Sequence, residues 1–340
     1  MITMSPKRRF LSALFGGRLD RASAANPTSI ATVELMEATG ASFPNAHLDP
    51  EKMADLAAGG HEILGYDTIA PVFSVQQEAA ALGCEMDWGD PLNMPVNTSS
   101  PFSDPAEFHM PPDFLERPSI RVVLDALRLL RQRYGSGAAI VGKVMGPWTL
   151  SYHLYGLQPF LEDTILSPRR VHGFLQAFKE VTIRFGRAQM EAGADLLVLA
   201  DHATGDLVSP ACYRDFLLPV HREITAALGA PTILHICGNT ANRLEYIASA
   251  GFDAFHFDSK VDPATALRLV DGKMTLIGNV NNPGTLLLGD PDEVRREVRS
   301  ILSAGIRIVG PECAVPLSTP NANLAAIPRA VGEYCQTSDE

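Results

Sequence analysis

The feature that most constrains this chain is a repeating alternation of helical and strand-like segments that begins near residue 119. Each amphipathic run is followed by a short apolar run, starting with a helix expected over 120–134 and a strand expected over 138–144. The apolar runs carry hydrophobic residues on both faces, which is typical of strands buried in a parallel sheet. The pattern therefore predicts an α/β fold.

The same pattern gives the expected elements. Later helices are expected over 168–192, 210–228, 241–250, 263–270 and 292–304, and later strands over 194–200, 231–238, 252–258, 274–278 and 306–313. The first part of the chain is less regular, with an amphipathic helix at its start, helices expected over 32–38 and 49–64 and a strand over 66–73. Counting two irregular units near the start, eight units close a (β/α)8 TIM barrel.

No stretch of the sequence reads as a linker between two domains. A chain of 340 residues with 46% hydrophobic residues suits one barrel of this type. We therefore expect a single barrel domain over 1–340, with an N-terminal helical extension over 1–65. The stretch 87–118 is dense in Pro, Asn and Ser and is a candidate lid loop.

Polar residues follow several of the expected strands. In barrels of this type the active site lies at the carboxyl ends of the strands. The residues that fall there are Asp201, His202, His235, Cys237, Asp258, Asn279 and Cys313. Groups far apart in the sequence are therefore expected to converge at one mouth.

His235 and Cys237 end one strand on the same face, and Cys313 ends another. One imidazole and two thiolates suit a zinc ion with an open coordination position, which is the catalytic kind of site. The paired Cys-x-x-Cys elements of a structural zinc site are missing. Asp258 is a candidate fourth ligand, and the alternative is a carboxylate that supports the ligands or caps a helix.

The net charge and the cysteines limit which partners and which cellular compartment are expected for the protein. A net charge of −11 argues against a nucleic-acid partner, and no apolar run approaches the roughly 18 residues of a membrane span. The five cysteines lack the spacing of a disulfide framework, which favours a reducing, cytoplasmic setting. Cys84, Cys212 and Cys335 are expected to be ordinary packing or surface thiols.

The runs His235-Ile-Cys-Gly-Asn and Gly310-Pro-Glu-Cys-Ala-Val-Pro carry a family resemblance. Together with Val33-Glu-Leu-Met-Glu-Ala-Thr-Gly, Gly146-Pro-Trp-Thr-Leu and Gly278-Asn-Val-Asn, they resemble the zinc methyltransferases of the methylcobamide:coenzyme M methyltransferase group, within the uroporphyrinogen decarboxylase superfamily. The resemblance implies a uroporphyrinogen decarboxylase-like barrel and a zinc ion held by His235, Cys237 and Cys313. It also implies an acidic residue at position 258 that is able to close the coordination shell.

The resemblance further implies the reaction, in which a thiol such as coenzyme M exchanges a methyl group with a corrinoid, a methylcobamide carried by a partner protein. The sequence has no Asp-x-His-x-x-Gly run to hold a corrinoid itself. One alternative is a substrate:corrinoid methyltransferase, of the O-demethylase or halomethane type. Others are uroporphyrinogen decarboxylase, which the absence of arginine over 24–33 disfavours, and a role for zinc as a structural staple.

The remaining polar residues of the mouth have open roles. Asp201 and His202 are expected to orient a ligand or hold water beside the metal, with a turn cap as the alternative for His202. Asn279 is expected to hydrogen-bond the substrate or to stabilise its own turn. His256 lies inside an apolar strand and is expected to be a core histidine.

Overall fold

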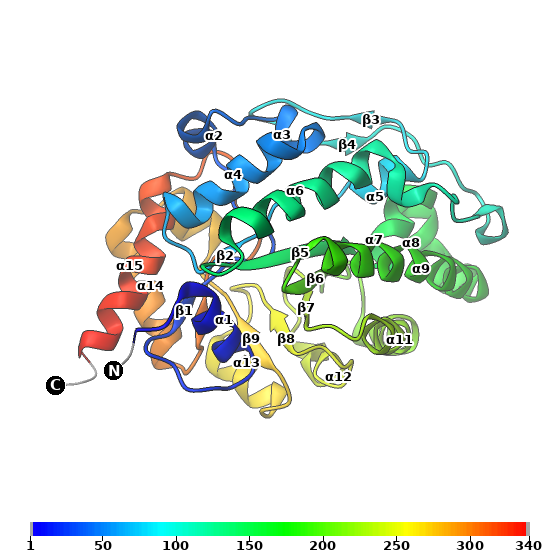
Figure 1. Cartoon of the computed structure of the whole chain (residues 1–340). Helices are drawn as coiled ribbons and strands as arrows, with labels where there is room; N and C mark the ends of the chain where they lie inside the picture. Colours follow the sequence, from blue (N-terminus) through cyan, green and yellow to red (C-terminus); the bar gives the residue numbers. More distant parts are fainter. Residues whose placement is uncertain (1–2, 338–340) are drawn as a thin grey trace.

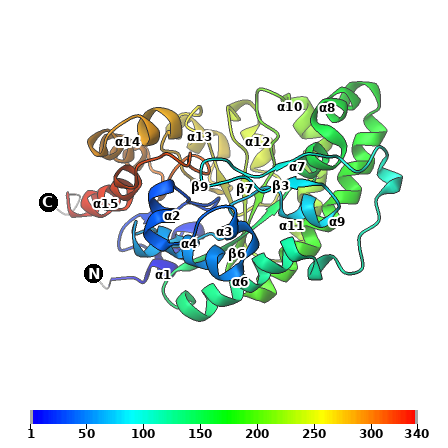
Figure 2. The same ribbon diagram turned by 90° about the horizontal axis from the view of Figure 1, so that it is seen from above.

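Eight parallel strands form the centre of the molecule in the computed structural model, which describes residues 3–337. Their order around the sheet is β1-β10-β9-β8-β7-β6-β5-β2, and helices surround them (Figures 1 and 2). The strands are β1 (Ser23–Ala24), β2 (Thr68–Ile69), β5 (Ala139–Met145), β6 (Leu196–Ala200), β7 (Thr232–His235), β8 (Ala254–His256), β9 (Thr275–Ile277) and β10 (Ile308–Val309). The (β/α)8 barrel predicted from the sequence is confirmed.

The helices follow the strands around the barrel. Those of the first part are α1 (Pro6–Leu14), α2 (Val33–Thr39), α3 (Asn45–Leu48), α4 (Pro50–Glu62) and α5 (Gln77–Ala81). Those of the regular part are α6 (Pro118–Tyr134), α7 (Pro147–Ser151), α8 (Leu157–Leu166), α9 (Pro168–Ala192), α10 (Pro210–Cys212), α11 (Leu218–Leu228), α12 (Leu244–Ile247), α13 (Pro263–Val270), α14 (Pro291–Ser303) and α15 (Asn321–Thr337). Single turns of 3-10 helix are η1 (Pro105–Glu107), η2 (Phe114–Glu116) and η5 (Ala241–Arg243), and π-helical turns are η3 (Tyr152–Gly156), η4 (Tyr213–Leu217) and η6 (Asn282–Leu287).

Several helices begin at an Asp-Pro pair, in which the carboxylate caps the free amides and proline suits the first turn. Asp49 accepts hydrogen bonds from the amides of Glu51 and Lys52 at the start of α4, and Asp262 accepts one from Thr265 at the start of α13. These caps explain why the sequence located both helix starts.

The half of the barrel interior nearer to the amino ends of the strands, called the lower half below, is filled with apolar side chains. Val141, Val198, Ile233 and Ile277 point inward from four strands, and Phe10 of α1 packs against this cluster. The amphipathic first helix predicted from the sequence therefore closes the end of the barrel at which the strands begin. The interior is thus a packed core, and chemistry is confined to the opposite end.

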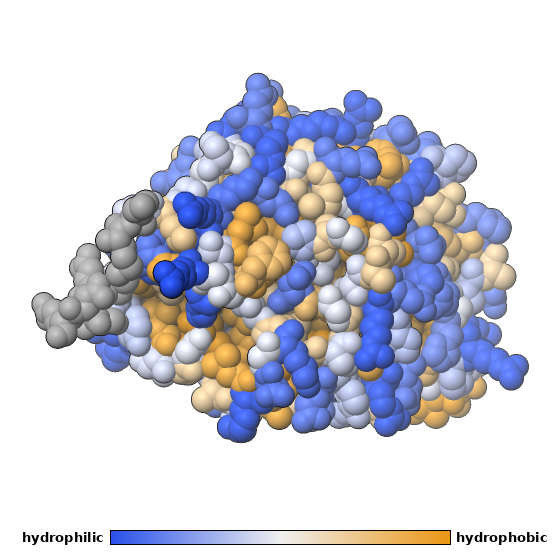
Figure 3. Space-filling view, turned by 60° about the horizontal axis from the view of Figure 1, so that its bottom comes forward, coloured by the Kyte–Doolittle hydropathy of each residue, from blue (hydrophilic) through white to orange (hydrophobic). Residues whose placement is uncertain are grey.

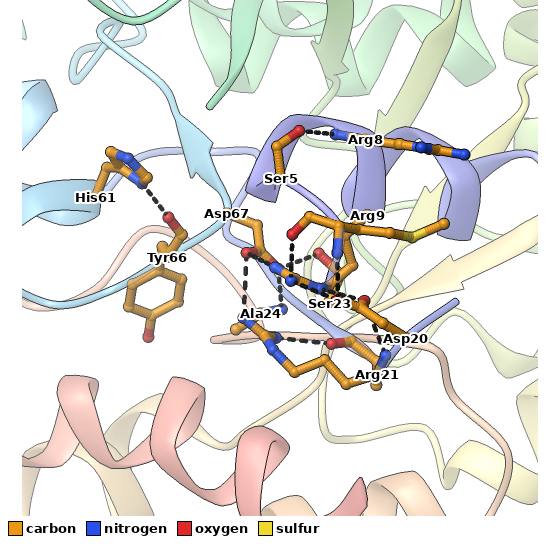
Figure 4. A network of polar contacts seen from close by, with 12 residues as sticks. Ser5, Arg8, Arg9, Asp20, Arg21, Ser23, Ala24, His61, Tyr66 and Asp67 are labelled. Carbon is orange, nitrogen blue, oxygen red and sulfur yellow. Dashed lines mark hydrogen bonds and ion pairs between the residues drawn. The ribbon is translucent and has the colours of Figure 1, made fainter. Parts of the chain in front are cut away.

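A buried ion-pair network joins β1 to β2 (Figure 4). The Asp67 carboxylate accepts hydrogen bonds from Arg9, from the Ser23 hydroxyl at 2.8 Å and from the Ala24 amide at 3.1 Å. Arg9 also pairs with Asp20, and this guanidinium holds the pKa of the Asp20 carboxyl well below its usual range. The Asp67 amide donates to the Ala24 carbonyl at 2.8 Å, so the network completes the barrel.

The stretch 87–118 runs from β3 to the start of α6, as Figure 1 shows. It contains two short strands and two 3-10 turns, so it is more ordered than the loop expected from its composition. The antiparallel strands are β3 (Met86–Asp87) and β4 (Val96–Asn97). Ser100 and Asn97 both donate to the carbonyl of His153 in η3, at 2.9 and 3.3 Å, which fixes the stretch to the mouth of the barrel.

Several expected elements differ from the structure, and the strand expected over 306–313 spans only Ile308–Val309, so Cys313 lies in the loop beyond the strand and not at its end. The strand expected over 66–73 pairs only over Thr68–Ile69, because Pro71 lacks an amide to donate to the sheet. The helix expected over 241–250 is a 3-10 turn followed by one α-helical turn, α12. The helix expected over 210–228 is continuous in outline but contains the π-helical turn η4.

The surface is mixed. On the face shown in Figure 3, hydrophilic residues are spread widely and hydrophobic residues gather in smaller areas between them. None of the helices within residues 3–337 has the length and apolar character needed to cross a membrane.

Candidate metal centre

Three predicted ligand atoms meet at the mouth of the barrel. His235 Nε2 lies 3.0 Å from Cys237 Sγ and 3.2 Å from Cys313 Sγ, and the two sulfurs are 3.2 Å apart. His235 ends β7, and Cys313 lies in the loop after β10. We call these three atoms the donor triangle. Among the side chains described, those of residues 3–334, no other group of three or more His, Cys, Asp or Glu residues is placed to hold a metal ion.

The donor set fits zinc. Zinc bonds measure about 2.3 Å to sulfur and about 2.0 Å to nitrogen, so ligand atoms around one ion lie roughly 3.5 Å apart. Each edge of the triangle therefore has to widen by a few tenths of an ångström, which small side-chain rotations supply. Three protein ligands leave one coordination position for a substrate.

His235 is oriented by the neighbouring strand. Its Nδ1 lies 3.2 Å from the carbonyl oxygen of His256, and because a carbonyl only accepts, Nδ1 carries the hydrogen and Nε2 keeps its lone pair for the metal. The His256 ring lies beside it, tilted by 35°, with ring centroids 4.6 Å apart. His256 Nε2 donates to the Pro311 carbonyl at 2.8 Å, two residues before Cys313. His256 thus links His235 to the loop that carries Cys313.

The two thiols of the triangle differ in acidity. The pKa of Cys313 is held well below its usual value, chiefly because Cys237 donates a hydrogen bond to its sulfur. The pKa of Cys237 is raised, because its hydrogen is shared with Cys313 and burial disfavours a second negative charge. Without a cation the pair therefore holds one proton, and a metal ion that displaces it gains a second thiolate.

Asp258 lies beside the triangle and is engaged elsewhere. One carboxylate oxygen accepts from the Gly238 amide at 2.8 Å and the other from the Lys260 amide at 2.9 Å. The carboxylate therefore holds the loop that carries Cys237. Its predicted place as fourth ligand requires it to leave the Gly238 amide, and it stays a prediction.

Asn279 lies under this loop. Its side-chain amide donates to the carbonyls of Asp258 and Val261, at 3.2 and 3.0 Å, and only 2% of the residue is exposed. These bonds support a segment other than the turn to which Asn279 itself belongs, and its predicted contact with the substrate stays a prediction. Asn279 positions the segment that follows β8.

Asp201 is completely buried and lies beneath the mouth. Its carboxylate accepts from the Thr149 amide at 2.7 Å, from the Thr149 hydroxyl at 3.0 Å and from His221 Nε2 at 3.0 Å. A Cβ atom on Gly146 would lie 2.2 Å from the Asp201 carboxyl carbon, so only glycine permits this approach. The Gly146-Pro-Trp-Thr run thus forms the helix start that Asp201 holds.

His202 is the member of this pair that faces the donor triangle. Its amide donates to the Thr149 hydroxyl at 2.8 Å, so the Asp201 network fixes its backbone. Its imidazole pKa is lowered, first by burial and then by the nearby His235. The structure therefore brings His202 toward the triangle and places Asp201 behind it.

Sequence reasoning missed one group of buried polar residues near the mouth. Lys143, at 3% exposed, lies in the otherwise apolar strand β5, and Glu78 of α5 accepts from the Met145 amide of the same strand at 2.8 Å. His47 of α3 is also buried, and neither of its ring nitrogens has a partner. The available signal was a lone lysine within a strand buried on both faces, since charged residues are rarely buried without a purpose.

The chain is similar to a known protein family, to curated relatives and to a solved structure. The family model described as uroporphyrinogen decarboxylase (URO-D) matches residues 5–334. A methylated-thiol–coenzyme M methyltransferase of Methanosarcina mazei is 37% identical, over 97% of this chain and 90% of its own. A methylcobamide:CoM methyltransferase of Methanosarcina barkeri is 33% identical, over 96% of this chain and 98% of its own. A solved methyltransferase structure from Methanosarcina mazei has a TM-score of 0.94 at 32% identity, covering 97% of this chain and 99% of that one.

Proposed function

The chain belongs to the uroporphyrinogen decarboxylase (URO-D) family, and on that premise we propose that it is a zinc enzyme that transfers a methyl group between the corrinoid of a partner protein and a small thiol such as coenzyme M. The relatives that match it along nearly the whole chain are named for methyl transfer to coenzyme M. The observation that carries the proposal is the donor triangle of one imidazole nitrogen and two sulfurs at the barrel mouth.

The donor set explains why zinc suits this reaction. Two thiolates and a neutral imidazole cancel the charge of the ion, so His235, Cys237 and Cys313 would hold it as a neutral unit. When bound there, zinc lowers the pKa of a thiol so that it is deprotonated near neutral pH while remaining nucleophilic.

The chain's own residues prepare the site for that thiol. His256 fixes the tautomer of His235, Asp258 and Asn279 hold the loop of Cys237, and the buried Asp201 network fixes the backbone of His202. The thiol gives up its proton to water, and its sulfur forms a bond to the methyl carbon. The methyl–cobalt bond breaks at the same time, and its electron pair stays on the cobalt. The products are a methyl thioether and the reduced corrinoid.

The corrinoid has to reach the site from outside. The lower half of the barrel is filled by side chains such as Val141 and Ile233, and α1 closes that end. The donor triangle therefore opens only toward the mouth, where the stretch 87–118 is fixed to η3. We propose that this stretch acts as a lid that excludes water while the reduced cobalt is exposed.

The test is an assay with free methylcobalamin as the methyl donor. Purified protein mixed with coenzyme M should remove the methyl–cobalt absorbance, and the Cys212→Ala control, which removes a thiol outside the donor triangle, should behave like the wild type. Zinc-loaded protein that demethylates methylcobalamin with no thiol of a broad panel would refute the proposal. Reaction only with methoxylated or halogenated donors and a reduced corrinoid would assign the opposite direction of transfer.

A further inference from the structure

Lys143 points into the barrel from β5. Along this strand Ala139 and Val141 belong to the apolar cluster of the interior, and Lys143 continues their face one step nearer the mouth. The alternate face is turned to the helices, since a Cβ on Gly142 would meet Gln189 and Leu197. A cationic side chain therefore enters the interior just above the packed layer.

The ammonium group of Lys143 has no hydrogen-bond or ion-pair partner among the side chains of residues 3–334. Its backbone exchanges hydrogen bonds with the Gln189 side chain, at 2.9 and 2.7 Å, whereas Nζ has no acceptor and no carboxylate lies within 4.0 Å of it. Burying a charge without a partner is costly unless a ligand supplies the partner. Only 3% of the residue is exposed, so few water molecules can reach the ammonium group.

The surroundings of Lys143 form a polar region beside the donor triangle. Lys143 interacts electrostatically with Cys313 on one side and with Glu78 and His47 on the other. One oxygen of Glu78 and both ring nitrogens of His47 are buried without a hydrogen-bond partner. Gln77 donates from its side chain to the His47 carbonyl at 3.1 Å, and its own side-chain oxygen is unpartnered as well. This region has hydrogen-bonding capacity that the protein itself does not use.

Neither the triangle nor Glu78 neutralises Lys143 in the loaded enzyme. Two thiolates, an imidazole and a zinc ion carry no net charge together. Burial raises the pKa of Glu78 to about 7, so its carboxyl group is partly protonated near neutral pH. Lys143 thus keeps the capacity to pair with an anionic ligand near Cys313.

We propose that Lys143 binds the anionic tail of the thiol substrate while the sulfur lies at the donor triangle. Lys143 is then the residue that selects acidic thiols over neutral ones. This inference rests on the proposed function and assigns its substrate class to a residue of the chain. Gln77 and His47 provide further polar contacts around the tail.

The test compares three thiols of matched length with methylcobalamin as donor: 2-mercaptoethanesulfonate, 2-mercaptoethanol and cysteamine. Lys143→Met should raise KM for the sulfonate about tenfold or more, because a charge-assisted hydrogen bond is lost. It should leave kcat, zinc content and the KM for 2-mercaptoethanol close to wild type. Lys260→Met removes a charge from the exposed rim instead and should leave the preference unchanged.

Binding of ethanesulfonate, which has no thiol, gives a readout independent of turnover. Calorimetry should show that it binds the wild type and Lys260→Met, and binds Lys143→Met at least tenfold more weakly. Equal binding to all three proteins, an unchanged sulfonate preference in Lys143→Met, or loss of zinc from that variant would overturn the inference. Should Lys143→Met not fold, Lys143→Gln serves the same comparison, and a wild type that fails to bind ethanesulfonate is itself decisive against it. A wild type that binds ethanesulfonate and demethylates methylcobalamin with no thiol would instead refute the proposed function alone.

Discussion

Replacement of Asp201 by alanine separates a positioning role from a direct catalytic one. The substitution leaves the Thr149 amide, the Thr149 hydroxyl and His221 Nε2 without their acceptor in a region of 0% exposure. Each unsatisfied buried donor costs about 1–3 kcal/mol, and removal of one partner from a buried charged network costs about 3–5 kcal/mol. Per-residue unfolding entropies convert this to a fall in Tm of about 5 °C for a chain of this length.

Thermal unfolding followed by circular dichroism measures this loss, and the fluorescence of Trp148, read in a Trp88→Phe background, reports on α7, the helix whose start the carboxylate holds. Asp201→Asn should lose about half as much, because the amide oxygen still accepts from Thr149 while the amide nitrogen opposes His221. Both variants should retain zinc. An Asp201→Ala protein with wild-type Tm and no turnover would contradict this reasoning and return Asp201 to the reacting groups.

Three further predictions concern the donor triangle and its neighbours. Cys313→Ala should lose zinc and turnover while its circular dichroism spectrum stays native, since a methyl group cannot replace a thiolate ligand; retained turnover would exclude Cys313. Asp258→Ala should weaken zinc binding roughly 10–100-fold in chelator competition, because the loop of Cys237 loses its support; unchanged affinity would contradict that role. Lys143→Met should stabilise the protein at pH 7 by about 3 kcal/mol. Burial lowers the pKa of Lys143 to about 8, below the 10.5 of an exposed lysine, so keeping this side chain protonated at pH 7 costs the folded state that free energy. The gain should shrink as pH rises from 8 to 10.5, where the folded wild type sheds its proton before the unfolded chain does, and equal gains in melts at pH 7 and pH 10 would refute it.

The sequence predicted the regular part of the fold closely, because its signals there are local. The helices α9 and α13 have the bounds expected from the sequence, starting at proline and ending where the amphipathic pattern stops. Strand β1 was not predicted, since two residues carry no periodicity and their pairing with β10 is a tertiary effect. Helix α15 was also missed, because Pro328 lies inside it and normally argues against a helix.

The metal ligands of the site were also predicted from local signals, whereas the residues that support them were not. The strand-end rule located His235, Cys237 and Cys313, and the structure brings their ligand atoms together. The partners of Asp201 were not readable, because Thr149 lies in α7 and His221 in α11, and both reach the carboxylate only when these helices pack beside the end of β6. Lys143 was passed over as part of an apolar run, although a single charge in such a run is a signal in its own right.

The central claim is that one imidazole and two sulfurs hold a zinc ion that the reaction requires. Elemental analysis of purified wild-type protein, read beside its methylcobalamin demethylation rate, tests this directly. The account predicts about one zinc per chain, with activity lost when a chelator removes the metal and restored when zinc is added back. Full activity in protein stripped of metal would contradict it.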